Sequence, residues 1–176
     1  MGLDITAYSH LRHLGRHTGD KPRCDVEGHI EALAYEDFPR SFRGIPILGR
    51  YANADGSAFL EGGCFEQSAQ TDTHAFHAGS YSGYGRWREN LANQFNPQPE
   101  VPGETYRGEP DPERPFYELI WFADNEGCIG PEAAADLLAD FRAHAGDYQP
   151  CFWQDTYHDW TRAFELAADG GLVRFH

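Results

Sequence analysis

The prolines of this chain are strongly concentrated in one stretch. Six of the eleven fall between residues 96 and 115, at positions 97, 99, 102, 110, 112 and 115. Proline fixes φ and lacks a backbone N–H, so this stretch can be neither a helix nor a central strand. We expect an extended surface loop over 96–115, too short to separate two domains of useful size. With 176 residues in all, the chain is close to the usual size of one domain, so a single domain is expected over 1–176.

Several short segments carry the pattern of β-strands. Residues Leu3 to Tyr8 alternate between apolar and polar positions, which is typical of a strand with one buried face. Two apolar runs flank an Asn-Ala-Asp-Gly turn, which predicts a hairpin, although Gly62-Gly63 suggests a bulge. The run F-Y-E-L-I-W-F is almost wholly apolar and predicts a central strand covered on both faces. The expected strands are 3–8, 45–51, 57–65, 73–78, 116–122 and 172–175.

Apolar residues spaced by three and four predict helices at four places. A helix over 30–38 is stopped by Pro39, and Gly130-Pro131 opens a helix that Gly146 ends. The four expected helices cover 30–38, the segment with Tyr84, Trp87, Leu91 and Phe95 on one face, 131–145 and about 152–168. Residues 9–29 are expected to be a loop with at most one helical turn. Strands come early and helices late, so we predict an α+β fold, a mainly antiparallel sheet with two to four helices packed on one side.

Charge and composition exclude several classes of protein. Lys plus Arg number 14 and Asp plus Glu number 28, for a net charge of −14. This balance argues against direct binding of nucleic acid, which needs clustered cations. No apolar run approaches the roughly 18 residues of a membrane helix, and no secretory pattern opens the sequence, so we expect a cytoplasmic protein with no membrane partner. Cys24, Cys64, Cys128 and Cys151 form no C-x-x-C pair, which excludes a zinc ribbon and favours buried thiols.

The strongest candidate for a binding site is the segment G-S-Y-S-G-Y-G-R-W-R at 79–88. Glycines at a strand-to-helix turn let an anion approach the backbone N–H groups of the helix start. Hydroxyl and guanidinium groups can hold phosphate, and aromatic rings can stack on a base. The candidate ligand-binding residues here are Ser80, Tyr81, Ser82, Tyr84, Arg86, Trp87 and Arg88. The alternative is a capped turn in which the glycines serve backbone geometry and the tyrosines pack.

Asp124 and Glu126 form a second candidate site, just after the predicted strand 116–122. They can meet the sugar or base of a ligand held by the first segment. Carboxylates in such a place can also bind a divalent cation or divide acid and base roles. The remaining alternative is a solvated turn near the positive end of the next helix. Whether the two candidate segments lie side by side stays open at this point.

Histidine and cysteine patterns give little support for metal binding or catalysis. His10, His13 and His17 would share one face of a helix and could bind a metal with Cys24, but Gly15 interrupts the stretch. His74 and His77 point to opposite faces of a strand and cannot chelate one ion. No G-x-S-x-G nucleophile motif is present, and Cys128 has no partner motif. We therefore expect no metal, no cofactor and no catalytic residue.

Three segments together resemble one protein family. They are the start M-G-L-D-I-T-A-Y, the run G-S-Y-S-G-Y-x-x-W-R over 79–88, and F-Y-E-L-I-x-F-x-D-x-E-G-x-I-G-P over 116–131. The combination is similar to uncharacterised proteins encoded by bacteriophages and prophages. The resemblance implies a phage-borne protein of the host bacterial cytosol and implies no mechanism. Accessory phage proteins of this size often act by binding, as inhibitors of host defences or as traps for nucleotide signals.

The sequence supports three functional hypotheses. The leading one is a non-enzymatic protein that binds or sequesters a nucleotide or phosphorylated signal to counter host defence. The alternative is an acidic inhibitor that binds a host defence protein through its negative surface. The second alternative is a metal-dependent phosphoester hydrolase using Asp124, Glu126 and a histidine. A homo-oligomer is compatible with each of them.

Overall fold

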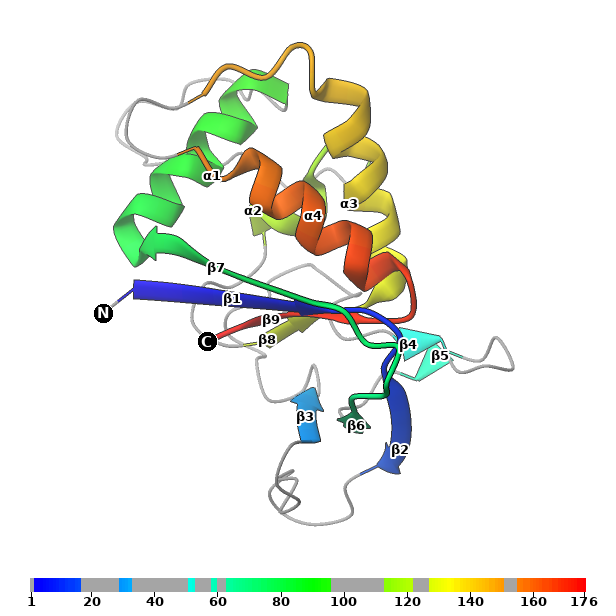
Figure 1. Ribbon diagram of the computed structural model, residues 1–176. Helices are drawn as coiled ribbons and strands as arrows, with labels where there is room; N and C mark the ends of the chain where they lie inside the picture. The colour runs from blue at the N-terminus through cyan, green and yellow to red at the C-terminus, as the bar shows by residue number, and fades with distance from the viewer. Residues whose placement is uncertain are drawn as a thin grey trace.

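The computed structural model describes residues 2–16, 29–32, 51–52, 58–59, 63–95, 113–121, 127–150 and 155–176. Figure 1 shows helices stacked on one side of a sheet and the smaller sheet of β2, β6 and β3 on its other side. The strands are β1 (Gly2–Tyr8), β2 (Arg12–Arg16), β3 (His29–Ala32), β4 (Tyr51–Ala52), β5 (Ala58–Phe59), β6 (Gly63–Glu66), β7 (Thr73–Ser80), β8 (Gly127–Ile129) and β9 (Leu172–Phe175). The helices are α1 (Tyr81–Phe95), α2 (Tyr117–Trp121), α3 (Pro131–His144) and α4 (Tyr157–Ala168).

The main sheet has the strand order β7-β1-β9-β8, and every neighbouring pair is antiparallel. Its central strands are therefore the first and the last of the described chain. Along β1, Leu3, Ile5 and Ala7 are buried beneath the helices, which confirms the strand that their alternation predicts. The strands predicted over 73–78 and 172–175 are confirmed as β7 and β9. The predicted α+β class, one antiparallel sheet with helices on one side, is thus what the structure shows.

Two smaller sheets complete the described strands. β4 pairs antiparallel with β5, with Tyr51 opposite Phe59, so the hairpin is confirmed where it is described. β6 lies between β2 and β3, both antiparallel to it. The single strand predicted over 57–65 is wrong, because Ala58–Phe59 and Gly63–Glu66 belong to different sheets. Residues 45–50, the turn 53–56 and Gly62 lie outside the described residues.

Two predictions for the N-terminal part are corrected. Residues Arg12–Arg16, expected within a loop, form β2, and His29–Ala32, expected to begin a helix, form β3. Both pair with β6, whose Phe65 is fully buried. Pairing with a distant strand decides their conformation, and local spacing carries no information about that partner. Residues 33–38 lie outside the described part of the chain.

The strand predicted over 116–122 is also wrong, because Tyr117–Trp121 form the short helix α2. Phe116 precedes it with φ of 60° and donates its N–H to Asp140 Oδ2 at 2.6 Å. Its carbonyl accepts the Ile120 N–H at 2.9 Å, which closes one helical turn. The side chains at 116–120 are buried, as predicted, but the backbone at 117–121 is helical and not extended. An apolar run without periodicity is compatible with either conformation.

Three longer helices supply most of the core. Tyr84, Trp87 and Leu91 of α1 are buried, as their spacing predicts, and Gly130 caps α3 with proline in its first turn, also as predicted. The helical spacing of the apolar residues predicts one buried face for α3, and Ala134, Leu137 and Phe141 are buried there while Leu138 is half-buried. Ala145, at the C-cap of the helix, is exposed. Trp160 and Phe164 of α4 close the core above β1 and β9, while residues 152–154 of the predicted helix lie outside the description.

A second, smaller cluster lies on the face of the main sheet opposite the helices. Phe65 from β6 contacts the buried side chains of Cys128 and Leu172 there, with Tyr8 and Leu11 at its edge. Cys128 is accordingly a buried thiol, in strand β8 and not at the start of a helix. Cys64 belongs to β6, whereas Cys24 and Cys151 lie outside the described residues. Among the helices described, none has the length and apolar character needed to span a bilayer.

Candidate functional site

The turn from β7 into α1 has the conformation that its glycines predict. Gly79 adopts φ of 100°, which strongly favours glycine, and α1 begins two residues later. Ser80 Oγ accepts the Gly83 N–H at 3.0 Å and lies 3.2 Å from Ser82 Oγ. Ser80 is therefore the N-cap of α1, and it satisfies one of the N–H groups at the helix start. Ser80 thus caps the helix, while its exposed hydroxyl keeps a hydrogen that it can donate.

The candidate residues of the segment 79–88 divide into an exposed and a buried set. Ser80, Ser82 and Arg86 are exposed, and Tyr81 is 36% exposed. Tyr84, Trp87 and Arg88 are each only 1% exposed. The first set can meet a ligand on the surface, and the second set lies in the core.

Ring contacts account for the buried set. The ring of Trp160 stacks on those of Tyr84 and Trp87, with centroids 5.7 Å apart in both pairs. The Arg88 guanidinium lies 4.5 Å from the centroid of the Tyr84 ring, a cation–π arrangement. Trp87 Nε1 also donates a hydrogen bond to the Tyr148 hydroxyl at 3.2 Å. These interactions make Tyr84, Trp87 and Arg88 structural residues of α1, and Tyr81 is the aromatic residue of this segment whose ring is exposed.

The second candidate pair, Asp124 and Glu126, lies outside the described residues. The description resumes at Gly127, the first residue of β8. β8 and β7 are opposite edges of the main sheet, with β9 and β1 between them. Three strand spacings of about 4.8 Å place these edges about 14 Å apart.

Two histidines of β7 lie beside carboxylates of neighbouring elements. His74 lies 3.2 Å from Asp159 of α4, and His77 lies 2.8 Å from Asp4 of β1. The two side chains project from opposite faces of β7, as predicted. Within the described residues, no three His, Cys, Asp or Glu side chains converge closely enough to hold a metal ion.

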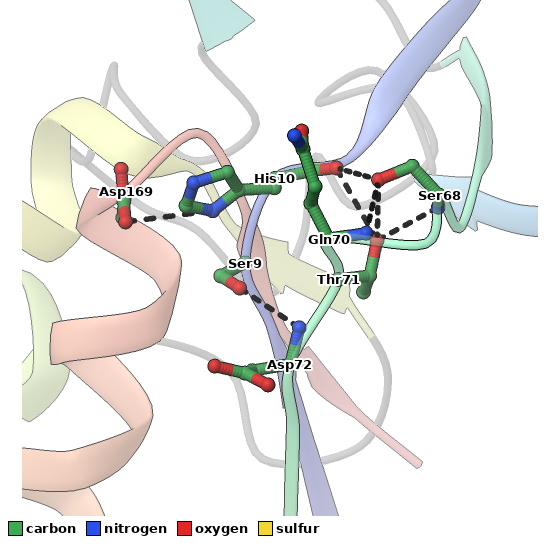
Figure 2. A network of polar contacts seen from close by, with 7 residues as sticks. All are labelled: Ser9, His10, Ser68, Gln70, Thr71, Asp72 and Asp169. Atoms are coloured by element: carbon green, nitrogen blue, oxygen red, sulfur yellow. Dashed lines mark hydrogen bonds and ion pairs between the residues drawn. The ribbon is translucent and has the colours of Figure 1, made fainter.

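His10 belongs to a network of polar contacts that joins three turns (Figure 2). Its carbonyl accepts the hydroxyls of Ser68 and Thr71, at 3.3 and 3.2 Å, and its ring lies 3.4 Å from Asp169. The predicted helical face shared by His10, His13 and His17 is wrong, because β2 follows directly and His17 lies outside the description. The network holds the backbone in place where β1 ends, so we interpret these contacts as structural.

Sequence reasoning missed an acidic cavity between α2 and α3. It has a volume of about 270 Å³ and is lined by Glu113, Arg114, Pro115, Glu118, Asp136, Ala139 and Asp140. We call it the α2–α3 cavity. Two sequence signals could have indicated it. Glu118 is the one carboxylate within an otherwise apolar run, and Asp136 and Asp140 are four residues apart on one helix.

Two carboxyl groups of the α2–α3 cavity, those of Glu118 and Asp140, have a raised pKa. Burial raises the pKa of Glu118, a hydrogen bond from its own backbone N–H opposes the rise, and the charges of Asp136 and Asp140 add to it. Burial also raises the pKa of Asp140, although the hydrogen bond from Phe116 lowers it in part. Both groups therefore bind a proton more tightly in the folded protein than in the unfolded chain.

Replacing Glu118 by glutamine is expected to stabilise the protein at neutral pH. The unfolded chain titrates this residue near its ordinary value of 4.5, and the folded protein retains the proton to higher pH. Folding stability therefore falls as pH rises from 4.5 through the raised pKa, and the Glu118→Gln variant lacks this loss. We expect a gain of about 1–3 kcal/mol at neutral pH and almost none below the unfolded pKa. Urea denaturation of both proteins across this pH range measures the difference.

Glu132→Gln is the matched control for this measurement. Glu132 is exposed in the first turn of α3, where a carboxylate is weakly favourable, so its replacement gives a small loss. An equal gain for Glu118→Gln at every pH would contradict the electrostatic account.

No family model, curated protein or solved structure matches the chain.

Proposed function

We propose that the protein binds a small phosphorylated ligand at the N-terminal turn of α1. The observation that carries the proposal is the exposed set Ser80, Tyr81, Ser82 and Arg86 around the start of a 15-residue helix. The first turn of this helix contains no acidic residue, so its partial positive charge is not neutralised within the turn. Backbone N–H groups, two hydroxyls and a guanidinium are the donors that bind phosphate oxygens in proteins.

The exposed ring of Tyr81 extends the proposal from a phosphate to a nucleotide. It lies next to the serine hydroxyls in the chain and can stack on a base or sugar. Sequestering such a ligand in the host bacterial cytosol, to counter a defence signal, is part of the proposal. This part depends on the sequence resemblance to phage-encoded proteins.

Calorimetry with nucleoside mono-, di- and triphosphates tests the proposal, with inorganic phosphate as the minimal ligand. Arg86→Ala is expected to weaken binding about tenfold or more, because a charge-assisted hydrogen bond is lost from an otherwise intact helix. The matched control is Arg162→Ala on α4, an exposed arginine that forms an ion pair with Glu165 of the same helix. It should leave the affinity unchanged. No heat with any of these ligands at high micromolar concentration would refute the proposal.

An acidic inhibitor of a host protein is the second candidate, favoured by the net charge of −14. Such binding depends on long-range attraction and weakens as salt screens it. A host protein captured at low salt, released at high salt and still captured by the Arg86→Ala variant would support this candidate over the first.

A further inference from the structure

The α2–α3 cavity contains a buried carboxylate that the described residues leave without a counter-charge. Glu118 is only 9% exposed and lines the cavity. Among the described residues, no cation lowers the pKa of this carboxyl group. The one interaction that lowers it is a hydrogen bond from the backbone N–H of Glu118 itself. A buried charge is strongly unfavourable unless it is paired or hydrogen-bonded. An oxygen of such a group that faces an open cavity is placed to receive a donor from a ligand.

The surroundings of Glu118 increase the negative potential of the cavity. Asp136 and Asp140 are four residues apart on α3, a spacing at which like charges repel. One oxygen of Asp140 accepts the Phe116 N–H, which holds this carboxylate at the cavity wall. Glu113 and Arg114, at the exposed rim, add one charge of each sign. The carboxylates of Glu118, Asp136 and Asp140 in one concave site therefore concentrate a field that attracts cations.

The arrangement fits an organic cation better than a metal ion. A metal needs several oxygens at one point, and no three such groups converge in the described part of the chain. The carboxylates are instead distributed around a volume of about 270 Å³, and Pro115 and Ala139 contribute apolar wall between them. Separated negative groups with apolar surface between them match the ammonium groups and methylene chain of an aliphatic diamine.

We propose that the α2–α3 cavity is a binding site for a short aliphatic diamine, with its ammonium groups beside Glu118 and the two aspartates of α3 and its methylenes against Pro115 and Ala139. This site is separate from the anion site at the start of α1. The ligand relieves the mutual repulsion of the carboxylates and supplies a counter-charge for Glu118. Binding is therefore coupled to stability, and the ligand raises the melting temperature as it fills the site.

Thermal denaturation and calorimetry of the full chain with putrescine test the proposal. We expect the melting temperature to rise with putrescine concentration, but not with butanediol, which has the same length and no charge. Glu118→Gln should weaken putrescine binding about tenfold or more, since it removes a buried charge that pairs with the ligand. Asp136→Asn, at an exposed position on the cavity rim, should weaken binding less, and the exposed Glu132→Gln should not change it.

The outcomes separate this proposal from its alternatives. No shift with putrescine at millimolar concentration would overturn it, as would equal binding by the wild type and the Glu118→Gln variant. An equal or larger shift with magnesium chloride at matched ionic strength would replace the organic ligand by an inorganic cation. We expect Arg86→Ala to leave putrescine binding unchanged, because Arg86 belongs to the anion site at α1 and not to the α2–α3 cavity. A failure of putrescine binding can therefore be told apart from a failure of phosphate binding at α1.

Discussion

Replacing Gly171 by alanine is expected to prevent stable folding. Gly171 lies between α4 and β9, and a Cβ atom built on it would coincide with the Tyr8 carbonyl and crowd Ser9 Cα. These are backbone atoms of the β1 end, so no side chain can move to make room. The Gly171 N–H also donates to the Ala167 carbonyl at 2.9 Å, which fixes the position of the turn. We expect a loss of at least about 3 kcal/mol, seen as a lower urea midpoint or an unfolded circular dichroism spectrum.

Gly85→Ala and Gly146→Ala are the controls for this prediction. A Cβ atom at either glycine meets nothing within 4 Å. Gly85 lies inside α1, where alanine is favoured over glycine by about 0.5–1 kcal/mol. Equal stability of Gly171→Ala and Gly146→Ala would show that the close approach of β1 and β9 is not as the structure describes it.

Replacing Trp160 by alanine is expected to be the most damaging change of a side chain. Trp160 is fully buried, and its ring centroid lies between 5.1 and 5.7 Å from those of Phe76, Tyr84, Trp87, Phe164 and Phe175. These rings come from β7, α1, α4 and β9, so one side chain joins the sheet to two helices. Truncation leaves a large cavity and should reduce the free energy of unfolding by about 3–5 kcal/mol.

Two variants separate packing from other effects at this position. Trp160 Nε1 has no hydrogen-bond acceptor among the described residues, so Trp160→Phe loses volume but no described hydrogen bond. We expect it to be clearly less destabilising than Trp160→Ala. His158→Ala, at an exposed position on the same helix, should change stability by no more than about 0.5 kcal/mol. Chemical denaturation followed by circular dichroism measures all three, and a small effect of Trp160→Ala would contradict the central role of this ring.

The sequence predicts well those elements whose apolar residues recur at regular spacing and whose ends carry glycine or proline. The alternation of Leu3, Ile5 and Ala7 predicts β1, and Gly130-Pro131 predicts where α3 begins. In both places the local preference and the tertiary packing favour the same structure. The helices α1 and α4 follow for the same reason, since one face of each carries regularly spaced aromatic residues.

The remaining elements depend on contacts that local patterns do not encode. β3 is a strand because it pairs with β6, more than thirty residues away. The segment at 116–120 is buried from all sides, so hydrophobicity has no period there that could distinguish a helix from a strand. The hydrogen bond between Phe116 and Asp140, which positions α2 against α3, joins residues 24 apart in the chain.

The candidate site was only partly predictable for a related reason. The glycine and serine pattern at 79–83 correctly indicates a strand-to-helix turn, whose cap is Ser80. The helical spacing of Tyr84 and Trp87 already predicts that both face the core, where they stack on Trp160, and this burial conflicts with the role in ligand binding that their residue type suggests. The α2–α3 cavity escaped detection because Glu118 and Asp140 meet only after two helices have packed together.

The pairing of β1 with β9 has a consequence for how the protein acquires its structure during translation. Asp4 and His176 exchange two backbone hydrogen bonds, at 2.8 and 3.0 Å. The N-terminal strand thus leaves the ribosome long before its neighbour β9 exists, and until then one of its edges has no partner. Contacts between such distant residues slow folding, because a long loop must close before they form. During synthesis, the edge of β1 that pairs with β9 is therefore exposed to chaperones and to aggregation until β9 has been made.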